Sequence, residues 1–294
     1  MVVQMKAAQI VEFDKPYQLC ETTKPTCGEN DLLVQVYAAG FCHSDLQVLQ
    51  GQFPAGLPMI PSHEPAGKIV QVGAQVQGNW KVGDRVGVLN FKNACRQCAT
   101  AWGALRKLKP EIKSGEAVAI VGIGGVGHLA LQFAKAMGYR TVAIDNRGEG
   151  RQLAQEVAEH LKPDLVIDSA ASQADQQILE FTLGEGLAGV VVCTDSIAAN
   201  AWSLQQLGNN GVMVPLGLPK DKWQFDSEAM VFRELIIKGS YVSSAEEAEL
   251  MFKIVAEHNI ASHLTVLSFD QIPSLVDRYL HKSMKGRLVI QIAQ

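Results

Sequence analysis

The sequence predicts an α/β protein in which a doubly wound parallel sheet is joined to a smaller β domain. Two observations support this fold class. Residues 1 to about 95 contain short segments in which apolar and polar residues alternate, as in half-buried strands. From Gly115 onward, apolar strand-like runs alternate with stretches of helical periodicity, which is typical of a parallel sheet covered by helices.

The composition fits a compact protein of two domains. The chain has 294 residues, of which 47% are hydrophobic and 19% charged, so a disordered chain is excluded. Its 26 basic and 30 acidic side chains give a net charge of −4, without a basic block that could neutralise a run of phosphates. We therefore expect no nucleic-acid partner.

The start of the chain lacks the pattern of a secretory signal. Residues 1–16 alternate apolar and polar side chains and include Glu12 and Asp14, where a signal would be basic and then apolar. The apolar stretch 117–134 contains four glycines and suits a strand, a turn and a helix better than a membrane span. We expect a cytoplasmic protein without a membrane partner.

Four alternating segments in the first part of the chain predict an irregular antiparallel β domain. Gly, Pro, Asn or Asp, which favour turns, close each of them. The segments are Lys6–Phe13, Leu32–Tyr37, Gly67–Val72 and Asp84–Leu89.

Six apolar runs, separated by helical stretches, predict the parallel sheet. They are Val118–Val121, Thr141–Asp145, Leu165–Asp168, Gly189–Thr194, Val212–Leu216 and Leu235–Val242. A helix follows the first run, because apolar residues recur at three- and four-residue spacing from Val126 to Met137. A further helix is expected around Ala245–Glu257, and a last strand, Arg287–Ile292, could return to the first domain.

The turn after the first run has the pattern of a dinucleotide-binding site. Gly122, Gly124 and Gly127 fit G-x-G-x-x-G between a strand and a helix. A pyrophosphate would bind at the helix N-terminus, where free N–H groups and the helix dipole favour an anion. Asp145, at the end of the next strand, would accept from the ribose hydroxyls and favour NAD over NADP, although Arg147 could pair with a 2′-phosphate. The alternative is that the glycines only permit close packing.

A second group of residues has the chemistry of a metal site. Cys42, His63 and Glu64 supply a thiol, an imidazole and a carboxyl group, all of which bind zinc. In a cytoplasmic chain the six cysteines are expected to be thiols or metal ligands rather than disulfides. Cys42 and His63 could alternatively be what remains of a site that no longer binds metal.

The sequence resembles the zinc-dependent alcohol dehydrogenases of the medium-chain dehydrogenase/reductase superfamily. The motifs are C-H-S-D-L at 42–46, H-E-P-A-G at 63–67, G-D-R-V-G at 83–87, A-T-A-W at 99–102, the glycine-rich turn and K-G-R at 285–287. The resemblance implies a GroES-like β-barrel catalytic domain, made of 1–110 and 244–294, around a Rossmann NAD-binding domain at 111–243. It also implies hydride transfer between nicotinamide and an alcohol or carbonyl substrate, a small molecule, in the cleft.

The resemblance assigns roles to individual residues. Cys42 and His63 match two catalytic zinc ligands, and Glu64 matches a carboxylate near the metal. Ser44 matches the hydroxyl that binds the substrate alcohol, and Asp45 matches the carboxylate that orients His63. The positions that match cofactor contacts are Gly122, Gly124, Gly125, Val126, Gly127, Asp145, His43, Thr100, Leu216, Ser240 and Arg287, and Phe53 matches a wall of the substrate pocket.

The sequence departs from the family where a segment is missing after Cys98. The pair Cys95 and Cys98 supplies only two of the four ligands of a structural zinc, so we expect no structural zinc. Arg96 stands at the position of the third catalytic ligand, for which Cys98 is a possible substitute, and Gln47 replaces a frequent relay histidine. These losses predict less than one zinc per chain and feeble oxidation of simple alcohols.

Two other functions are compatible with the sequence. One is a zinc-free enzyme that reduces an activated C=C bond or catalyses a non-redox rearrangement, and the other is a catalytically silent NAD-binding protein. The apolar run Leu235–Val242 would form an exposed sheet edge, so a homodimer or larger homo-oligomer is expected. His128 is expected on a helix surface or against the sheet.

Overall fold

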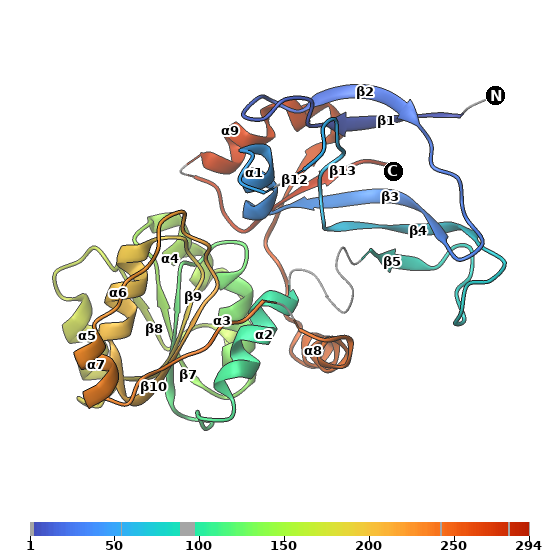
Figure 1. Cartoon of the computed structure of the whole chain (residues 1–294). Helices are drawn as coiled ribbons and strands as arrows, with labels where there is room; N and C mark the ends of the chain where they lie inside the picture. The colour runs from blue at the N-terminus through green and yellow to red at the C-terminus, as the bar shows by residue number, and fades with distance from the viewer. Residues whose placement is uncertain (1–2, 54, 89–97, 242, 282, 294) are drawn as a thin grey trace. The chain divides into compact units, whose positions relative to one another are not determined.

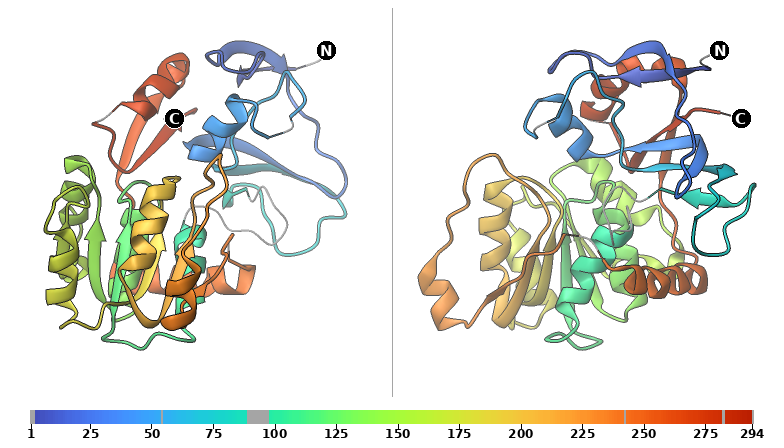
Figure 2. Two further views of the ribbon diagram at one scale, coloured as in Figure 1. Left: turned by 60° about the vertical axis from the view of Figure 1, so that its left-hand side comes forward. Right: turned by 45° about the vertical axis from the view of Figure 1, so that its right-hand side comes forward.

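The computed structural model describes residues 3–53, 55–88, 98–241, 243–281 and 283–293 (Figures 1 and 2). The chain divides into two compact units. One, here called the terminal unit, consists of Met1–Lys92 and Leu264–Gln294, and the other, the central unit, consists of Asn93–His263. Among the described residues, no helix is long and apolar enough to cross a membrane.

The central unit contains a six-stranded sheet in the order β11-β10-β9-β6-β7-β8. All neighbouring strands are parallel, so the predicted doubly wound sheet is confirmed. The strand order reverses between β6 and β9, which is where such sheets bind ligands. The strands are β6 (Ala117–Val121), β7 (Arg140–Ile144), β8 (Leu165–Ile167), β9 (Leu187–Val192), β10 (Leu207–Pro215) and β11 (Ile236–Ile237).

The last strand of this sheet is much shorter than predicted. The apolar run Leu235–Val242 contributes only the two residues of β11, which pair with Val212 and Met213 of β10. Because β11 lies at the edge of the sheet, only β10 holds it, and Gly239 follows soon after. Val242 lies outside the described residues.

Helices cover both faces of the parallel sheet (Figures 1 and 2). Val118 and Ile120 of β6 belong to one buried cluster, and Ala117, Ala119 and Val121 belong to another, as alternation along a strand requires. The helices are α2 (Cys98–Leu108), α3 (Gly127–Ala136), α4 (Gly148–Gln155), α5 (Ala174–Phe181), α6 (Ile197–Gln205), α7 (Ser227–Phe232) and α8 (Ala245–His258), with the 3-10 turn η1 (Glu159–Leu161).

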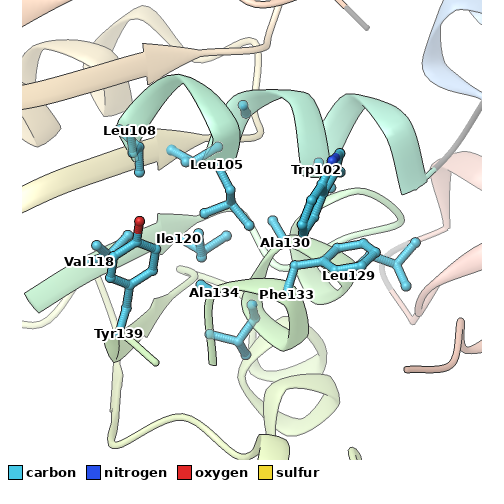
Figure 3. Close-up of a cluster of buried hydrophobic side chains, with 14 of the residues drawn as sticks. Trp102, Leu105, Leu108, Val118, Ile120, Leu129, Ala130, Phe133, Ala134 and Tyr139 are labelled. Atoms are coloured by element: carbon cyan, nitrogen blue, oxygen red, sulfur yellow. The ribbon is translucent and has the colours of Figure 1, made fainter. Parts of the chain in front are cut away.

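Figure 3 shows the core that holds α2 and α3 against the sheet. Trp102, Leu105 and Leu108 recur at three-residue spacing on α2 and face α3 and β6. The indole of Trp102 meets the ring of Phe133 edge-on, with 5.4 Å between centroids. The helix α3, which begins at the last glycine of the turn, is therefore packed against α2 and the sheet.

The terminal unit contains a two-stranded and a five-stranded sheet. β1 (Gln4–Gln9) pairs antiparallel with β2 (Gln18–Thr23), and the larger sheet has the order β12-β13-β3-β4-β5. Its strands are β3 (Leu32–Phe41), β4 (Pro65–Val72), β5 (Arg85–Gly87), β12 (Leu264–Ser268) and β13 (Arg287–Gln291). β13 pairs antiparallel with β3, so the last strand does return to the first domain.

The remaining elements of the terminal unit are helical. They are α1 (His43–Leu49), η2 (Phe269–Ser274) and α9 (Leu275–Leu280). The first predicted strand ends four residues early, at Gln9, because Ile10 leaves β2 and pairs with Met59 instead. The chain then turns at Asp14, which has a left-handed φ of 58°. β2 and β12 have no predicted counterpart, and β12 runs parallel to β13, which departs from the expected antiparallel domain.

Candidate active site

Cys42 lies where a strand gives way to a helix. β3 ends at Phe41, and Cys42 has the extended backbone of an N-cap before α1, with φ −106° and ψ 163°. Its backbone N–H donates to Oδ2 of Asp45 at 2.8 Å, within the first turn of α1. This bond fixes the start of the helix and buries the Asp45 carboxylate beside Cys42.

Asp45 also orients His63, which precedes β4. The distance from His63 Nδ1 to Asp45 Oδ1 is 3.1 Å, and because a carboxylate only accepts, Nδ1 carries the proton. The other ring nitrogen, Nε2, lies 3.4 Å from Ser44 Oγ and 3.8 Å from Glu64 Oε1. Nε2 thereby faces the hydroxyl and carboxyl groups of the site, where its lone pair becomes available to a metal when Nε2 gives up its proton.

Cys42, His63 and Glu64 form a group that could hold a metal ion. One ligand atom from each lies within 4.8 Å of the others, the only such cluster of at least three His, Cys, Asp or Glu in the part of the chain that the structure describes. A thiolate, an imidazole and a carboxylate are ligands that zinc accepts, and catalytic zinc sites use three protein ligands and an open position. The residues present therefore fit a catalytic zinc.

Glu64 has a second partner in this site. Its Oε1 lies 3.5 Å from a guanidinium nitrogen of Arg287 at the start of β13, and both side chains are buried. The same nitrogen of Arg287 lies 3.4 Å from the carbonyl oxygen of Phe41. The resemblance implies that Arg287 approaches the cofactor phosphates, and the structure shows that its guanidinium also lies against the carboxylate of the metal-binding group.

These contacts shift the pKa values of the group. Burial alone would raise the pKa of Cys42, but the hydrogen bond with His63 and the charge of Arg287 outweigh it and lower the pKa. Burial would lower the pKa of His63, but the hydrogen bonds with Asp45 and Cys42 raise it to about 10. For Glu64, burial raises the pKa against the opposing charge of Arg287. Cys42 is thus poised to be a thiolate, the form that binds metal.

The glycine-rich turn has the close approaches that the motif requires. Gly122 has φ +88°, which favours glycine. At Gly127, a Cβ atom would collide with the carbonyl oxygen of Gly122. Gly124 instead faces open space, since no heavy atom lies within 4 Å of its ideal Cβ position. The turn therefore leaves backbone exposed on one side, where a pyrophosphate could approach.

Asp145 follows β7 and supports this turn. Its buried carboxylate accepts from Ile123 N at 2.8 Å and from Arg147 N at 2.8 Å. Arg147 also contacts it through its guanidinium, with Nε 3.3 Å from Oδ1 and a terminal nitrogen 3.3 Å from Oδ2. The carboxylate thus holds a half-exposed guanidinium at the expected ribose position.

The other predicted site residues occupy both units. In the central unit, Thr100 lies in α2, Leu216 follows β10 and Ser240 follows β11. In the terminal unit, His43 lies in α1, 3.4 Å from the hydroxyl of Tyr279, and Phe53 follows α1 and is exposed. Cys98 begins α2. Cys95 and Arg96 lie outside the described residues.

Sequence reasoning missed the contacts of Tyr279, His128 and Gln132. Tyr279 contacts the ring of His43 from the distant helix α9. His128 is buried rather than exposed on the helix, and both of its ring nitrogens meet backbone groups. Only the mixture of polar side chains with the apolar spacing of α3 could have pointed to His128 and Gln132.

Comparisons with known proteins identify the family. The alcohol dehydrogenase GroES-like domain matches residues 28–137, and the zinc-binding dehydrogenase domain matches residues 125–257. An alcohol dehydrogenase of Geobacillus stearothermophilus is 30% identical over 345 aligned positions, which cover 98% of this chain and 100% of that protein. Because this chain has 294 residues, that relative contains residues without a counterpart here.

Solved structures share the fold. An acetophenone reductase of Geotrichum candidum in complex with NAD superposes with a TM-score of 0.80 at 21% identity, covering 98% of this chain and 97% of that one. A zinc-binding dehydrogenase of Sinorhizobium meliloti 1021 bound to NADP superposes with a TM-score of 0.83 at 21% identity, covering 99% and 100%. These two structures show the fold, and the domain matches and the 30% identical relative show the family. The chain belongs to the zinc-type alcohol dehydrogenases of the medium-chain dehydrogenase/reductase superfamily.

Proposed function

We propose that this chain is an NAD(H)-dependent oxidoreductase that transfers a hydride between nicotinamide and an alcohol or carbonyl substrate, with zinc held by Cys42, His63 and Glu64. The observation that carries the proposal is the three-donor group within 4.8 Å. The names of the relatives support the substrate class, since the 30% identical relative is an alcohol dehydrogenase. When bound, zinc would act as a Lewis acid toward the substrate oxygen.

The chain's own residues supply positioning and proton transfer. Asp45 holds His63 in the tautomer that presents Nε2 to a metal. Ser44, with Oγ 3.4 Å from His63 Nε2, would hydrogen-bond the substrate hydroxyl and, as it takes that proton, release its own hydroxyl proton to solvent. The glycine-rich turn and Asp145 would bind the dinucleotide. Cys42, His63 and Ser44 are therefore the residues on which turnover would depend.

One observation favours a second candidate function, a zinc-free reductase of an activated C=C bond. Glu64 already has a cationic partner, because Arg287 lies 3.5 Å from it. A cation that binds here must share that carboxylate with the guanidinium, which weakens its electrostatic attraction. If the site stays without metal, the dinucleotide site could still deliver a hydride.

An assay that follows the reduction of NAD and the oxidation of NADH separates these candidates. Zinc-loaded protein is mixed with NAD and a panel of primary and secondary alcohols, and metal-free protein with NADH and activated alkenes. Alcohol oxidation that disappears in His63→Ala supports the first candidate, and alkene reduction without metal supports the second. Dinucleotide binding with neither reaction would show a catalytically silent protein.

We expect NAD(H) to bind at least about tenfold more tightly than NADP(H), because the Asp145 carboxylate would repel a 2′-phosphate. Arg147 opposes this preference, since its guanidinium lies against that carboxylate. Arg147→Ala should therefore widen the preference and Asp145→Ala should narrow it. Dissociation constants from calorimetry check both changes. Equal affinities for the two dinucleotides in the wild-type chain would contradict the expectation.

We also propose a homodimer or larger homo-oligomer that uses the β11 edge of the central unit. Large apolar side chains are exposed near this edge, with Phe225 51%, Val231 70% and Phe232 79% exposed. Burial of such side chains against a second copy would remove them from water. Light scattering at micromolar concentration is expected to give at least a dimer mass, and Phe232→Lys is expected to lower it. A monomeric wild-type mass would contradict this proposal.

A further inference from the structure

His128 has an unusual pair of partners at the start of α3. It follows the last glycine of the turn directly and its side chain is buried. The distance from Nδ1 to the carbonyl oxygen of Gly124 is 2.8 Å, and Nε2 lies 3.0 Å from the backbone nitrogen of His263. A carbonyl only accepts and an amide N–H only donates. The ring therefore carries its proton on Nδ1 and its lone pair on Nε2.

The bond to Gly124 restrains the peptide between Gly124 and Gly125. The Gly124 oxygen accepts both the backbone N–H of His128, at 3.1 Å, and the Nδ1–H of the same residue. Because a peptide group is planar and trans, the N–H of Gly125 points opposite to that oxygen. Two adjacent glycines rotate easily, so a second donor on the oxygen opposes a flip of this peptide. The Gly125 N–H is thereby held facing away from the helix.

One turn further along α3, Gln132 binds the segment Ala261–His263, to which the second partner of His128 belongs. Its amide nitrogen donates to Ala261 O at 2.9 Å, and its amide oxygen accepts from Ala261 N at 3.2 Å. The segment Ala261–His263 closes the central unit, directly before β12 begins at Leu264. His128 and Gln132 together fix this segment to α3, but only His128 touches the glycine-rich turn.

We infer that His128 is a positioning residue for the dinucleotide. Through Nδ1 it sets the Gly124–Gly125 peptide so that an N–H faces the pyrophosphate, and through Nε2 it anchors the segment Ala261–His263 to the same turn. This inference rests on the proposed function, because it assumes that a dinucleotide binds at Gly122–Gly127. In this role the buried side chain of His128 sets the orientation of the Gly125 N–H, one of the backbone groups that would bind the anion.

Two substitutions separate the two nitrogens of the ring. In His128→Asn, the side-chain amide nitrogen occupies the place of Nδ1 and can still donate to Gly124, but nothing reaches His263. In His128→Gln, the amide oxygen occupies the place of Nε2 and can still accept from His263, but the donor to Gly124 is lost. Gln132→Met is the matched control. It frees Ala261 and the backbone carbonyl of His128, but it leaves both partners of the His128 ring in place.

The readouts are the dissociation constants for NADH and NADPH, hydrogen exchange of the His263 amide, and the melting temperature. We expect His128→Gln to weaken binding of the preferred dinucleotide about tenfold, the cost of one hydrogen bond. His128→Asn should bind within about threefold of wild type, but exchange its His263 amide faster. Gln132→Met should melt at a lower temperature and bind normally. If the dinucleotide affinity of the variants fell in step with their melting temperatures, whichever ring nitrogen was replaced, the inference would be overturned.

The exchange measurement keeps this inference distinct from the proposed function. If the wild-type chain bound neither NADH nor NADPH, the proposed function would fail, and the role of His128 in dinucleotide binding would fail with it. Faster His263 exchange in His128→Asn but not in His128→Gln would still establish the anchor. If the His263 amide exchanged equally fast in both variants, His128 would not anchor this segment. If wild type binds a dinucleotide and all three variants bind equally well, only the positioning role is wrong.

Discussion

Gly127→Ala is expected to destabilise the central unit by about 3 kcal/mol or more, because a Cβ atom has no room there. The carbonyl oxygen of Gly122 occupies that space, and it is backbone rather than a side chain that could move aside. The start of α3 would have to shift away from the turn, so dinucleotide binding should fall as well. Denaturant unfolding and calorimetric titration with NADH measure the two losses.

Gly124→Ala is the matched control for this prediction. No heavy atom lies within 4 Å of the added Cβ, so the free energy of unfolding should change by less than about 1 kcal/mol. The new methyl group would nevertheless stand where the pyrophosphate approaches the backbone, and affinity for NADH should fall at least about tenfold. A stable Gly127→Ala protein, or a Gly124→Ala protein with normal affinity, would show that the turn does not have these roles.

Asp45→Ala is expected to weaken zinc binding about 10- to 100-fold, the usual effect of removing a partner that orients a ligand histidine. The carboxylate accepts from the Cys42 N–H and from His63 Nδ1, so both ligands lose their positions at once. Loss of the helix cap should cost about 1 kcal/mol of stability in addition. A chelator competition assay and thermal unfolding measure the two effects.

Asp226→Ala separates the stability effect from the effect on zinc. Asp226 caps α7, where its Oδ1 accepts from Glu228 N at 2.9 Å, and α7 belongs to the central unit. Its removal should lower stability by a similar amount, about 1 kcal/mol, and leave zinc affinity unchanged. If Asp45→Ala and Asp226→Ala had the same zinc affinity, the orienting role of Asp45 would be refuted.

The sequence predicts the fold well where hydrophobic patterns are long. The first four of the six runs of the parallel sheet contain the observed strands or most of their residues, because strands buried on both faces are apolar throughout. The run Val212–Leu216 contains only the second, buried part of β10. In the sixth run only Ile236 and Ile237 pair. The sequence K-G-S at 238–240 interrupts its apolar residues, and its position at the sheet edge leaves it a single neighbouring strand. β2 is missed because Gln18–Thr23 is mostly polar.

The sequence likewise predicts only part of the candidate site. The motifs at 42–46 and 63–67 contain the residues that lie together, and Asp45 does contact His63. The pair of Glu64 and Arg287 joins residues that are distant in the chain, and only the pairing of β13 with β3 brings the start of β13 beside the site. His128 escapes sequence reasoning for another reason. Its partners are backbone groups of Gly124 and His263, which every residue possesses.

We propose that Cys42, His63 and Glu64 bind one zinc ion, and a zinc titration of the metal-free chain is the decisive experiment. As purified, the chain is expected to hold less than one zinc, because Arg287 competes for Glu64. Titration in competition with a chromophoric chelator should reach one zinc per chain, and Cys42→Ser and Glu64→Gln should each weaken binding at least about tenfold. Wild-type protein that binds no zinc, or variants that bind it as tightly as wild type, would contradict the claim.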